Sequence, residues 1–161
     1  MKKILLLGIL IVLIAGCGVP NQVAPSTQNY ECEEYGYAIT APAGWIVAEA
    51  PDCIVSLLGI EDDLFLNVVV SVQDTDLDIA SLMLEELDKL ERSELYVDTN
   101  VLNVGTNNIE FTYFMGEQVH ANMELYVSGG HVYAVVRQAY ETEYYGHETE
   151  LAAIADTFRF I

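Results

Sequence analysis

The chain contains very few basic residues. Six of its 161 residues are Lys or Arg and 25 are Asp or Glu, which gives a formal net charge of −19. Contacts to phosphate need Lys and Arg, so this balance argues against a nucleic-acid-binding protein. It also argues against direct docking of the folded part on an anionic membrane surface. Such an excess of acid favours solubility in a salty or cation-rich exterior, where screening relieves self-repulsion, and the alternative is a cationic partner or bound divalent ions.

The sequence also lacks the short motifs of known catalytic and metal sites. It has no Gly-x-Ser-x-Gly nucleophile motif and no glycine loop that would cradle a phosphate. Its three histidines, His120, His131 and His147, are scattered without the local spacing of a zinc motif. We expect each of them to be a satisfied surface or edge histidine. Cys32 beside a histidine is a conceivable nucleophile, but no signature supports it.

These absences favour a binding or assembly module over an enzyme. We therefore predict a non-enzymatic protein without a cofactor, whose partner is another protein. The alternative is a divalent-cation-binding or hydrolytic enzyme of the cell envelope, built on the scattered acids and histidines. A deep pocket with convergent carboxylates and a histidine would favour that alternative.

The N-terminal apolar run is too short to cross a membrane. Residues 4–15 follow Lys2 and Lys3 and span 12 residues, whereas a spanning helix needs about 20. Basic residues, a short apolar segment and small residues are the pattern of a secretory signal peptide, and a transmembrane anchor is the alternative. The sequence Ile14-Ala15-Gly16-Cys17 resembles the lipobox of prokaryotic lipoproteins. The resemblance implies a signal peptide over residues 1–16, a lipid on Cys17 and an extracytoplasmic domain anchored to the cell membrane.

The next segment is predicted to link this anchor to a single domain. Residues 18–29 carry no charge and include Pro20 and Pro25, which is typical of a flexible tether. Residues 30–161 have the length of one domain, and apolar residues make up 52% of the chain, enough for a packed core. Removal of residues 1–16 would leave four basic against 25 acidic side chains, a net charge of −21.

Only three cysteines occur, and lipidation of Cys17 would leave two. Cys32 and Cys53 then form an even pair in an oxidising compartment, so we predict a disulfide between them. The alternative is two separately buried free thiols.

Hydrophobic periodicity predicts an antiparallel sheet with helices. Alternating or apolar runs predict strands over residues 35–40, 54–60, 64–73, 96–104, 109–115, 120–127 and 131–139. Apolar residues three or four apart predict a helix over residues 78–94, and a second helix is expected over residues 147–156. This order predicts an α+β domain in which an antiparallel sheet of about six strands is flanked by helices.

Both ends of this region resemble one family. Residues 35–45 (YGYAITAPAGW) resemble the opening of PsbP-like domains, and residues 153–160 (AIADTFRF) resemble their last helix and aromatic tail. The element order between them also matches. The resemblance implies an αβα sandwich over residues 30–161 and a role in binding or assembly, and it assigns no functional residue.

Two clusters remain as candidate sites. Asp74, Asp76 and Asp78, with Glu85 in the twelfth position, match the acidic positions of a calcium loop. Ile79 replaces the glycine that such a loop needs, so an acidic helix N-terminus is the favoured interpretation and a weak divalent-cation contact the alternative.

The tyrosines form the other cluster. They gather in two groups, Tyr30, Tyr35 and Tyr37 at the start of the domain and Tyr140, Tyr144 and Tyr145 before the last helix. Exposed together they would form an aromatic and acidic recognition surface; otherwise their rings pack under helix ends.

Overall fold

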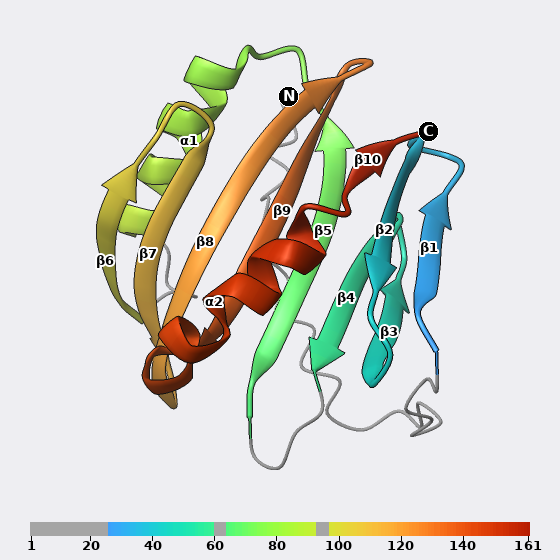
Figure 1. Ribbon diagram of the computed structural model, residues 1–161. Coiled ribbons are helices and arrows are strands. Elements are labelled where there is room, and N and C mark those ends of the chain that lie inside the picture. Colours follow the sequence, from blue (N-terminus) through green and yellow to red (C-terminus); the bar gives the residue numbers. More distant parts are fainter. Residues whose placement is uncertain (1–25, 60–63, 93–96) are drawn as a thin grey trace.

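A seven-stranded antiparallel sheet forms the centre of the fold (Figure 1). The computed structural model describes residues 26–59, 64–92 and 97–161. Within them the sheet has the order β3-β4-β5-β9-β8-β7-β6. Its strands are β3 Trp45–Ala50, β4 Ile54–Gly59, β5 Leu66–Asp74, β6 Val97–Val104, β7 Asn108–Met115, β8 Glu117–Ser128 and β9 His131–Tyr140.

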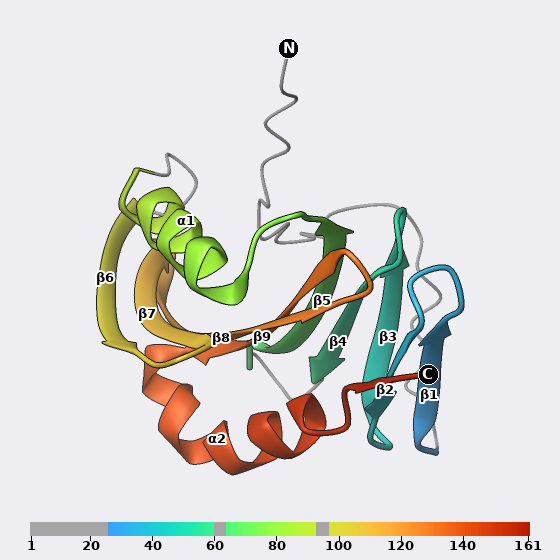
Figure 2. The same cartoon turned by 90° about the horizontal axis from the view of Figure 1, so that it is seen from above.

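A second, smaller sheet lies beside the β3 side of the large one (Figures 1 and 2). It has the order β1-β2-β10, with β1 Gln28–Cys32, β2 Tyr37–Ala41 and β10 Arg159–Phe160. The last strand of the chain therefore pairs with a strand near its start, and this pairing closes the domain.

One helix covers each face of the large sheet (Figure 2). α1 Ile79–Arg92 packs on β7 and β8, while α2 Glu141–Ala155 packs on the opposite face, against β9, β5 and β8. The side chains of strand β5 alternate between the two faces of the sheet, so they contribute to the cores beneath both helices. Leu66, Val68, Val70 and Val72 belong to the core beneath α2, whereas Phe65, directly before the strand, packs against the core beneath α1.

The structure confirms the predicted fold class and most predicted elements, with three additional strands. β1, β3 and β10 were not predicted, because the first is polar, the second follows a turn and the third has only two residues. The sheet therefore has seven strands instead of about six, and β2 belongs to the smaller sheet. Regular structure also begins at Gln28, within the segment expected to be a tether.

The last helix begins six residues earlier than predicted, at Glu141 instead of residue 147. Gly146 lies inside it and masks the helical pattern, since glycine is a poor helix former. Glu141 and Glu143 favour the earlier start, because carboxylates in the first turn suit the positive end of the helix dipole.

The predicted signal peptide, Cys17 and most of the tether lie outside the described residues. Among the helices that are described, none is both long enough and apolar enough to cross a membrane.

Candidate functional site

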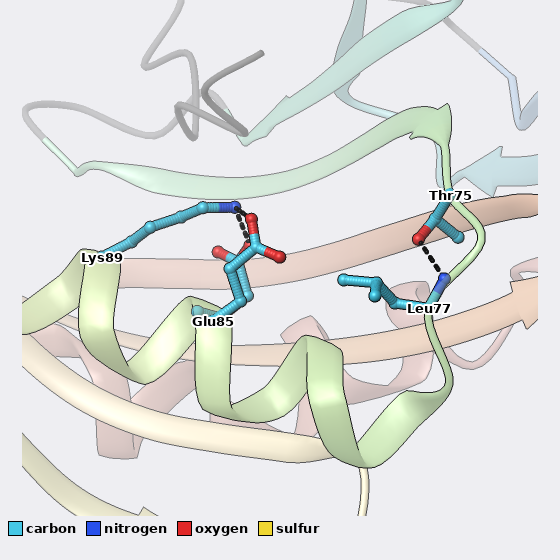
Figure 3. Close-up of polar contacts among 5 residues, drawn as sticks. Thr75, Leu77, Glu85 and Lys89 are labelled. Atoms are coloured by element: carbon cyan, nitrogen blue, oxygen red, sulfur yellow. Dashed lines mark hydrogen bonds and ion pairs between the residues drawn. The ribbon is translucent and has the colours of Figure 1, made fainter. Parts of the chain in front are cut away.

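The acidic segment before α1 does not assemble the calcium loop considered from sequence. The Oδ1 atom of Asp78 accepts a hydrogen bond from the Ser81 amide at 2.8 Å, so this carboxylate caps the helix. Glu85 lies on the helix and pairs with Lys89 at 3.1 Å, well separated from Thr75 and Leu77 (Figure 3). Within the described residues, no group of three or more His, Cys, Asp or Glu side chains is arranged to hold a metal.

Asp74 is directed instead to the start of β9. Its Oδ1 lies 2.9 Å from Nδ1 of His131, which is its cross-strand partner in the sheet. Two aspartates of the segment, Asp74 and Asp78, therefore contact separate local structures, and all three aspartates, Asp76 included, are exposed.

The predicted disulfide between Cys32 and Cys53 is confirmed, with a Cα–Cα distance of 5.9 Å. It joins the end of β1 to the turn between β3 and β4. Both central residues of that turn, Asp52 and Cys53, have positive φ angles of 60° and 54°. Non-glycine residues rarely adopt this conformation, so the turn is strained. The disulfide and a hydrogen bond from the Tyr37 hydroxyl to the Cys53 carbonyl hold it in place.

The disulfide gathers acidic residues from different elements around Tyr35. Glu34 follows Cys32, Asp52 precedes Cys53, and Asp74 reaches the same end of the domain from β5. Partial burial, followed by the negative charges of Glu34, Asp74 and Asp52, raises the pKa of the Tyr35 phenol. No ion pair between described residues joins a Lys or Arg to any of these three carboxylates. We call Glu34, Tyr35, Asp52, Asp74 and His131 the acidic tip.

Aromatic residues support this tip from beneath. The Tyr35 ring meets His131 edge-on at 5.2 Å, and the Tyr35 carbonyl accepts a hydrogen bond of 2.7 Å from the Tyr133 hydroxyl. Phe160 lies edge-on to Tyr133 at 5.0 Å and is 45% exposed, and Ile161 beside it is 59% exposed. The acidic tip therefore lies next to an apolar, partly exposed surface formed by Phe160 and Ile161, to which Tyr133 connects it.

The acidic tip lies away from the point where the chain enters the domain. β1 begins at Gln28 and ends at Cys32, and Figure 1 shows the β1–β2 turn, the start of β4, the end of β5 and the C-terminus at one end of the molecule. The four residue steps from Gln28 to Cys32, at about 3.3 Å each, separate this end from Gln28 by roughly 13 Å.

A second polar cluster lies between the sheet and α2, and it corrects the prediction for His120. This histidine is fully buried rather than at the surface or an edge, because α2 covers the face of β8 that it occupies. Its Nε2 lies 2.8 Å from Oε1 of Glu110, its ring stacks on Tyr144 at 3.8 Å, and Tyr145 meets it edge-on at 5.3 Å.

The other members of this cluster come from β7, β8 and β9. In the sheet register Glu110, Asn122 and Arg137 form one row across the three strands. Arg137 Nη1 lies 3.4 Å from Oε1 of Glu124, whose Oε2 accepts a hydrogen bond of 2.6 Å from the Tyr126 hydroxyl. We call Glu110, His120, Asn122, Glu124, Arg137 and Tyr144 the polar layer.

Three buried atoms of the polar layer have no hydrogen-bond partner within the described part of the chain: Nδ1 of His120, Oδ1 of Asn122 and Nε of Arg137. A fourth such atom, Nε2 of Gln138, points to the opposite face of the sheet, where the side-chain carbonyl of Gln138 accepts a bond from Tyr113. An unsatisfied buried polar atom costs about 1–3 kcal/mol, so a concentration of three on one face calls for an explanation.

The tyrosine groups therefore have mixed positions. Tyr37 and Tyr144 are buried, Tyr30 and Tyr35 are partly buried, and Tyr145 is 67% exposed. His147, the third predicted surface histidine, lies on α2 with its Nδ1 3.2 Å from Oε2 of Glu150. Sequence reasoning missed Asn122, Glu124 and Arg137. Their alternation on β8 and β9 is typical of a solvent-facing side, and only the position of α2 shows otherwise.

Comparisons with known proteins show the fold. No protein-family model matches the sequence, and comparison with curated proteins gives no match. The solved structure of the cyanobacterial PsbP protein (CyanoP) from Synechocystis is similar with a TM-score of 0.56 and 14% identity, over 92% of this chain and 99% of that one. A protein from Bacteroides thetaiotaomicron is similar with a TM-score of 0.53 and 12% identity, over 85% of this chain and 49% of that one. These likenesses confirm the expected PsbP-like fold, and at such identities they show the fold alone.

Proposed function

We propose that this protein is a lipid-anchored, extracytoplasmic, non-enzymatic binding module that holds a cationic protein partner at its acidic tip. The observation that carries this proposal is geometric: the Cys32–Cys53 disulfide joins the segments that hold Glu34 and Asp52, and His131 contacts both Tyr35 and Asp74. The exposed Phe160 lies beside them, and no Lys or Arg of the described residues is paired to these carboxylates. An apolar centre with a charged rim is the usual anatomy of a protein-recognition surface.

The chemistry of the tip favours a partner rich in Lys or Arg. Such side chains pair with the carboxylates, and their cationic groups also interact favourably with the face of a tyrosine ring. The surrounding charge supports the same partner, because the described acidic side chains far outnumber the basic ones and attract cations over distance.

The position of the tip suits a tethered module. The chain enters at Gln28, and the tip is at the other end of β1. A lipid on Cys17 with an uncharged linker would therefore leave the tip directed away from the attachment point. The lipobox-like sequence supports this anchor, and the disulfide agrees with an oxidising compartment.

Site-specific photocrosslinking in the host's own membranes tests the binding surface. A benzoylphenylalanine at Phe160 is expected to capture one discrete partner, whereas the same group at Tyr145, exposed on α2, captures none. Neutralising the tip with Glu34→Gln and Asp52→Asn is expected to abolish the adduct. The matched pair Glu141→Gln and Glu143→Gln should leave it unchanged. An adduct that forms equally from both positions, or survives neutralisation of the tip, would refute the assignment.

The anchor is tested separately by metabolic labelling with an alkyne fatty acid. The wild-type chain is expected to carry the label and to sediment with membranes. Cys17→Ser is expected to lose the label, whereas Cys32→Ser, which changes another cysteine, is expected to keep it. Labelled Cys17→Ser protein would show that the lipid is elsewhere.

A further inference from the structure

Two of the three unpartnered atoms of the polar layer belong to residues that are almost completely buried. His120 is 0% exposed and Asn122 is 6% exposed, and both point toward α2 from β8. Arg137 lies opposite Asn122 on β9, so all three unpartnered atoms belong to one small area of the sheet. The polar layer is distant in the fold from the acidic tip, and a role for this layer is independent of the proposed function.

The three unpartnered atoms determine which hydrogen-bonding groups a ligand needs. With Nε2–H of His120 donated to Glu110, Nδ1 presents a lone pair. Oδ1 of Asn122 is a second free acceptor, and Nε–H of Arg137 is a free donor. A group that fits them offers at least two donors and one acceptor. Hydroxyl and amide groups supply both donors and acceptors, and a small polyhydroxylated molecule carries several of them.

The charges of the polar layer favour an uncharged occupant. Glu110 already pairs with His120 and Glu124 with Arg137, so an uncharged occupant leaves these pairs intact, whereas a charged one would compete with them. Aromatic rings border the same area: Tyr126 bonds to Glu124, and Tyr144 and Tyr145 contact His120. The Tyr144 ring is already stacked on His120, whereas the exposed Tyr145 ring leaves an apolar face against which the C–H groups of a sugar ring pack.

The first ten residues of α2 cover this area and bury few side chains, and the last of them, Glu150, accepts a hydrogen bond of 3.2 Å from the Trp45 indole. Within residues 141–150 the only buried side chain is Tyr144, whereas Leu151, Ile154 and Ala155 anchor the rest of the helix. No side chain caps the helix at Tyr140. Gly146 lies within this part, and a Cβ there would meet nothing within 4 Å, so packing does not require glycine. Glycine weakens a helix at this point.

We propose that the polar layer is a binding site for a small uncharged polyhydroxyl ligand of the saccharide class, covered by residues 141–150 as a lid that opens at Gly146. The ligand donates hydroxyl or amide hydrogens to His120 and Asn122 and accepts a hydrogen bond from Arg137. Glu110 and Glu124 hold His120 and Arg137 in position.

Three sugars of the same ring size test the proposal on the full lipidated chain in detergent micelles. N-acetylglucosamine is neutral, glucosamine carries an ammonium group and glucuronate carries a carboxylate. Amide chemical shifts in NMR titrations are expected to change saturably with N-acetylglucosamine at residues 141–147 and near Asn122. The two charged sugars are expected to bind at least tenfold more weakly. Saturable binding of either charged sugar with equal or higher affinity, or no saturable shift with N-acetylglucosamine, overturns the proposal.

Variants separate the site from nonspecific binding. Asn122→Leu is expected to raise the Kd for N-acetylglucosamine at least tenfold. Asn67→Leu is the matched control, because Asn67 is also buried but lies on the other face, bonded to Ser56. Arg137→Lys, which keeps the charge beside Glu124 but lacks Nε–H, serves if Asn122→Leu fails to fold. An unchanged Kd in the folded variants would overturn the assignment.

Hydrogen exchange tests the lid. Amides of residues 143–147 are expected to exchange faster than those of residues 152–155 and to slow when N-acetylglucosamine binds. Gly146→Ala is expected to slow their exchange about fivefold without the sugar, because alanine strengthens the helix. Equal exchange along the whole of α2, unaffected by the sugar, would overturn the lid.

Discussion

Removal of the disulfide should change the stability of the domain through two separable effects of opposite sign. Cys32 and Cys53 are 21 residues apart, and closing a loop of this length in the unfolded chain is worth about 3 kcal/mol on the chain-entropy model. We therefore expect Cys32→Ser/Cys53→Ser to lower the free energy of unfolding by about 3 kcal/mol and the Tm by roughly 10 °C.

The second effect is the strain of the β3–β4 turn. Cys53 has a φ of 54°, which costs a side-chain-bearing residue about 1 kcal/mol relative to glycine. In Cys32→Ser/Cys53→Gly the chain-entropy loss is the same, but the turn is relaxed. This variant should be about 1 kcal/mol more stable than Cys32→Ser/Cys53→Ser.

Urea unfolding followed by tryptophan fluorescence measures both effects, because the single tryptophan, Trp45, is buried in the core beneath α2. The wild-type chain under reducing conditions provides a third state that lacks the bridge but keeps both cysteines. A loss below about 1 kcal/mol in the serine variant would refute the entropy reasoning. Equal stability of the serine and glycine variants would refute the strain. Photocrosslinking from Phe160 should also weaken in both, since the bridge holds Glu34 beside Asp52.

Three further predictions concern α1 and the segment before it. Burial raises the pKa of Glu86 despite its pairing with Lys89, so the folded state favours the protonated form and the free energy of unfolding falls as pH rises from about 4.5 toward the raised pKa. Glu86→Gln should therefore raise the Tm at pH 7 and flatten the dependence of stability on pH. Glu85→Gln, at an exposed position, should do neither. The hydrogen bonds from Ser81 lower the pKa of Asp78, so the stabilisation that this carboxylate gives is present above its ordinary pKa and is lost as pH falls through the lowered pKa. Asp78→Ala should reduce the Tm by about 3 °C at pH 7, and Asp76→Ala should leave the Tm unchanged. Isothermal titration with calcium chloride should show no saturable site, because Asp74 and Asp78 already have protein partners.

Each of these three measurements has an outcome that contradicts the structure. A Glu86→Gln variant that melts lower than wild type at pH 7 would mean that the Lys89 pair outweighs the burial of Glu86. Equal effects of Asp78→Ala and Asp76→Ala would exclude a specific cap. Stoichiometric calcium binding would support the calcium loop that the sequence disfavours because Ile79 replaces the required glycine.

The sequence by itself determined the elements that depend on neighbouring residues. Apolar spacing placed α1, and alternation placed β5 and its two faces, because periodicity is a local property of the chain. The Ser128-Gly129-Gly130 turn between β8 and β9 was also predictable, since both glycines adopt the positive φ that such hairpins need. The disulfide was also predictable, because two cysteines remain once Cys17 is assigned to lipidation, and the structure confirms their pairing.

Only the tertiary structure decided the role of each polar residue. His120, Asn122 and Arg137 alternate with apolar residues as a solvent-facing side would, yet α2 buries them because it returns across that face of the sheet. Glu34, Asp52 and Asp74 are far apart in the chain and lie at one end of the fold only because the β1–β2 turn, the β3–β4 turn and the end of β5 are placed there (Figure 1). The local pattern records whether a residue is polar. Whether that polarity faces solvent, a second layer or another loop depends on contacts between distant segments, which periodicity does not encode.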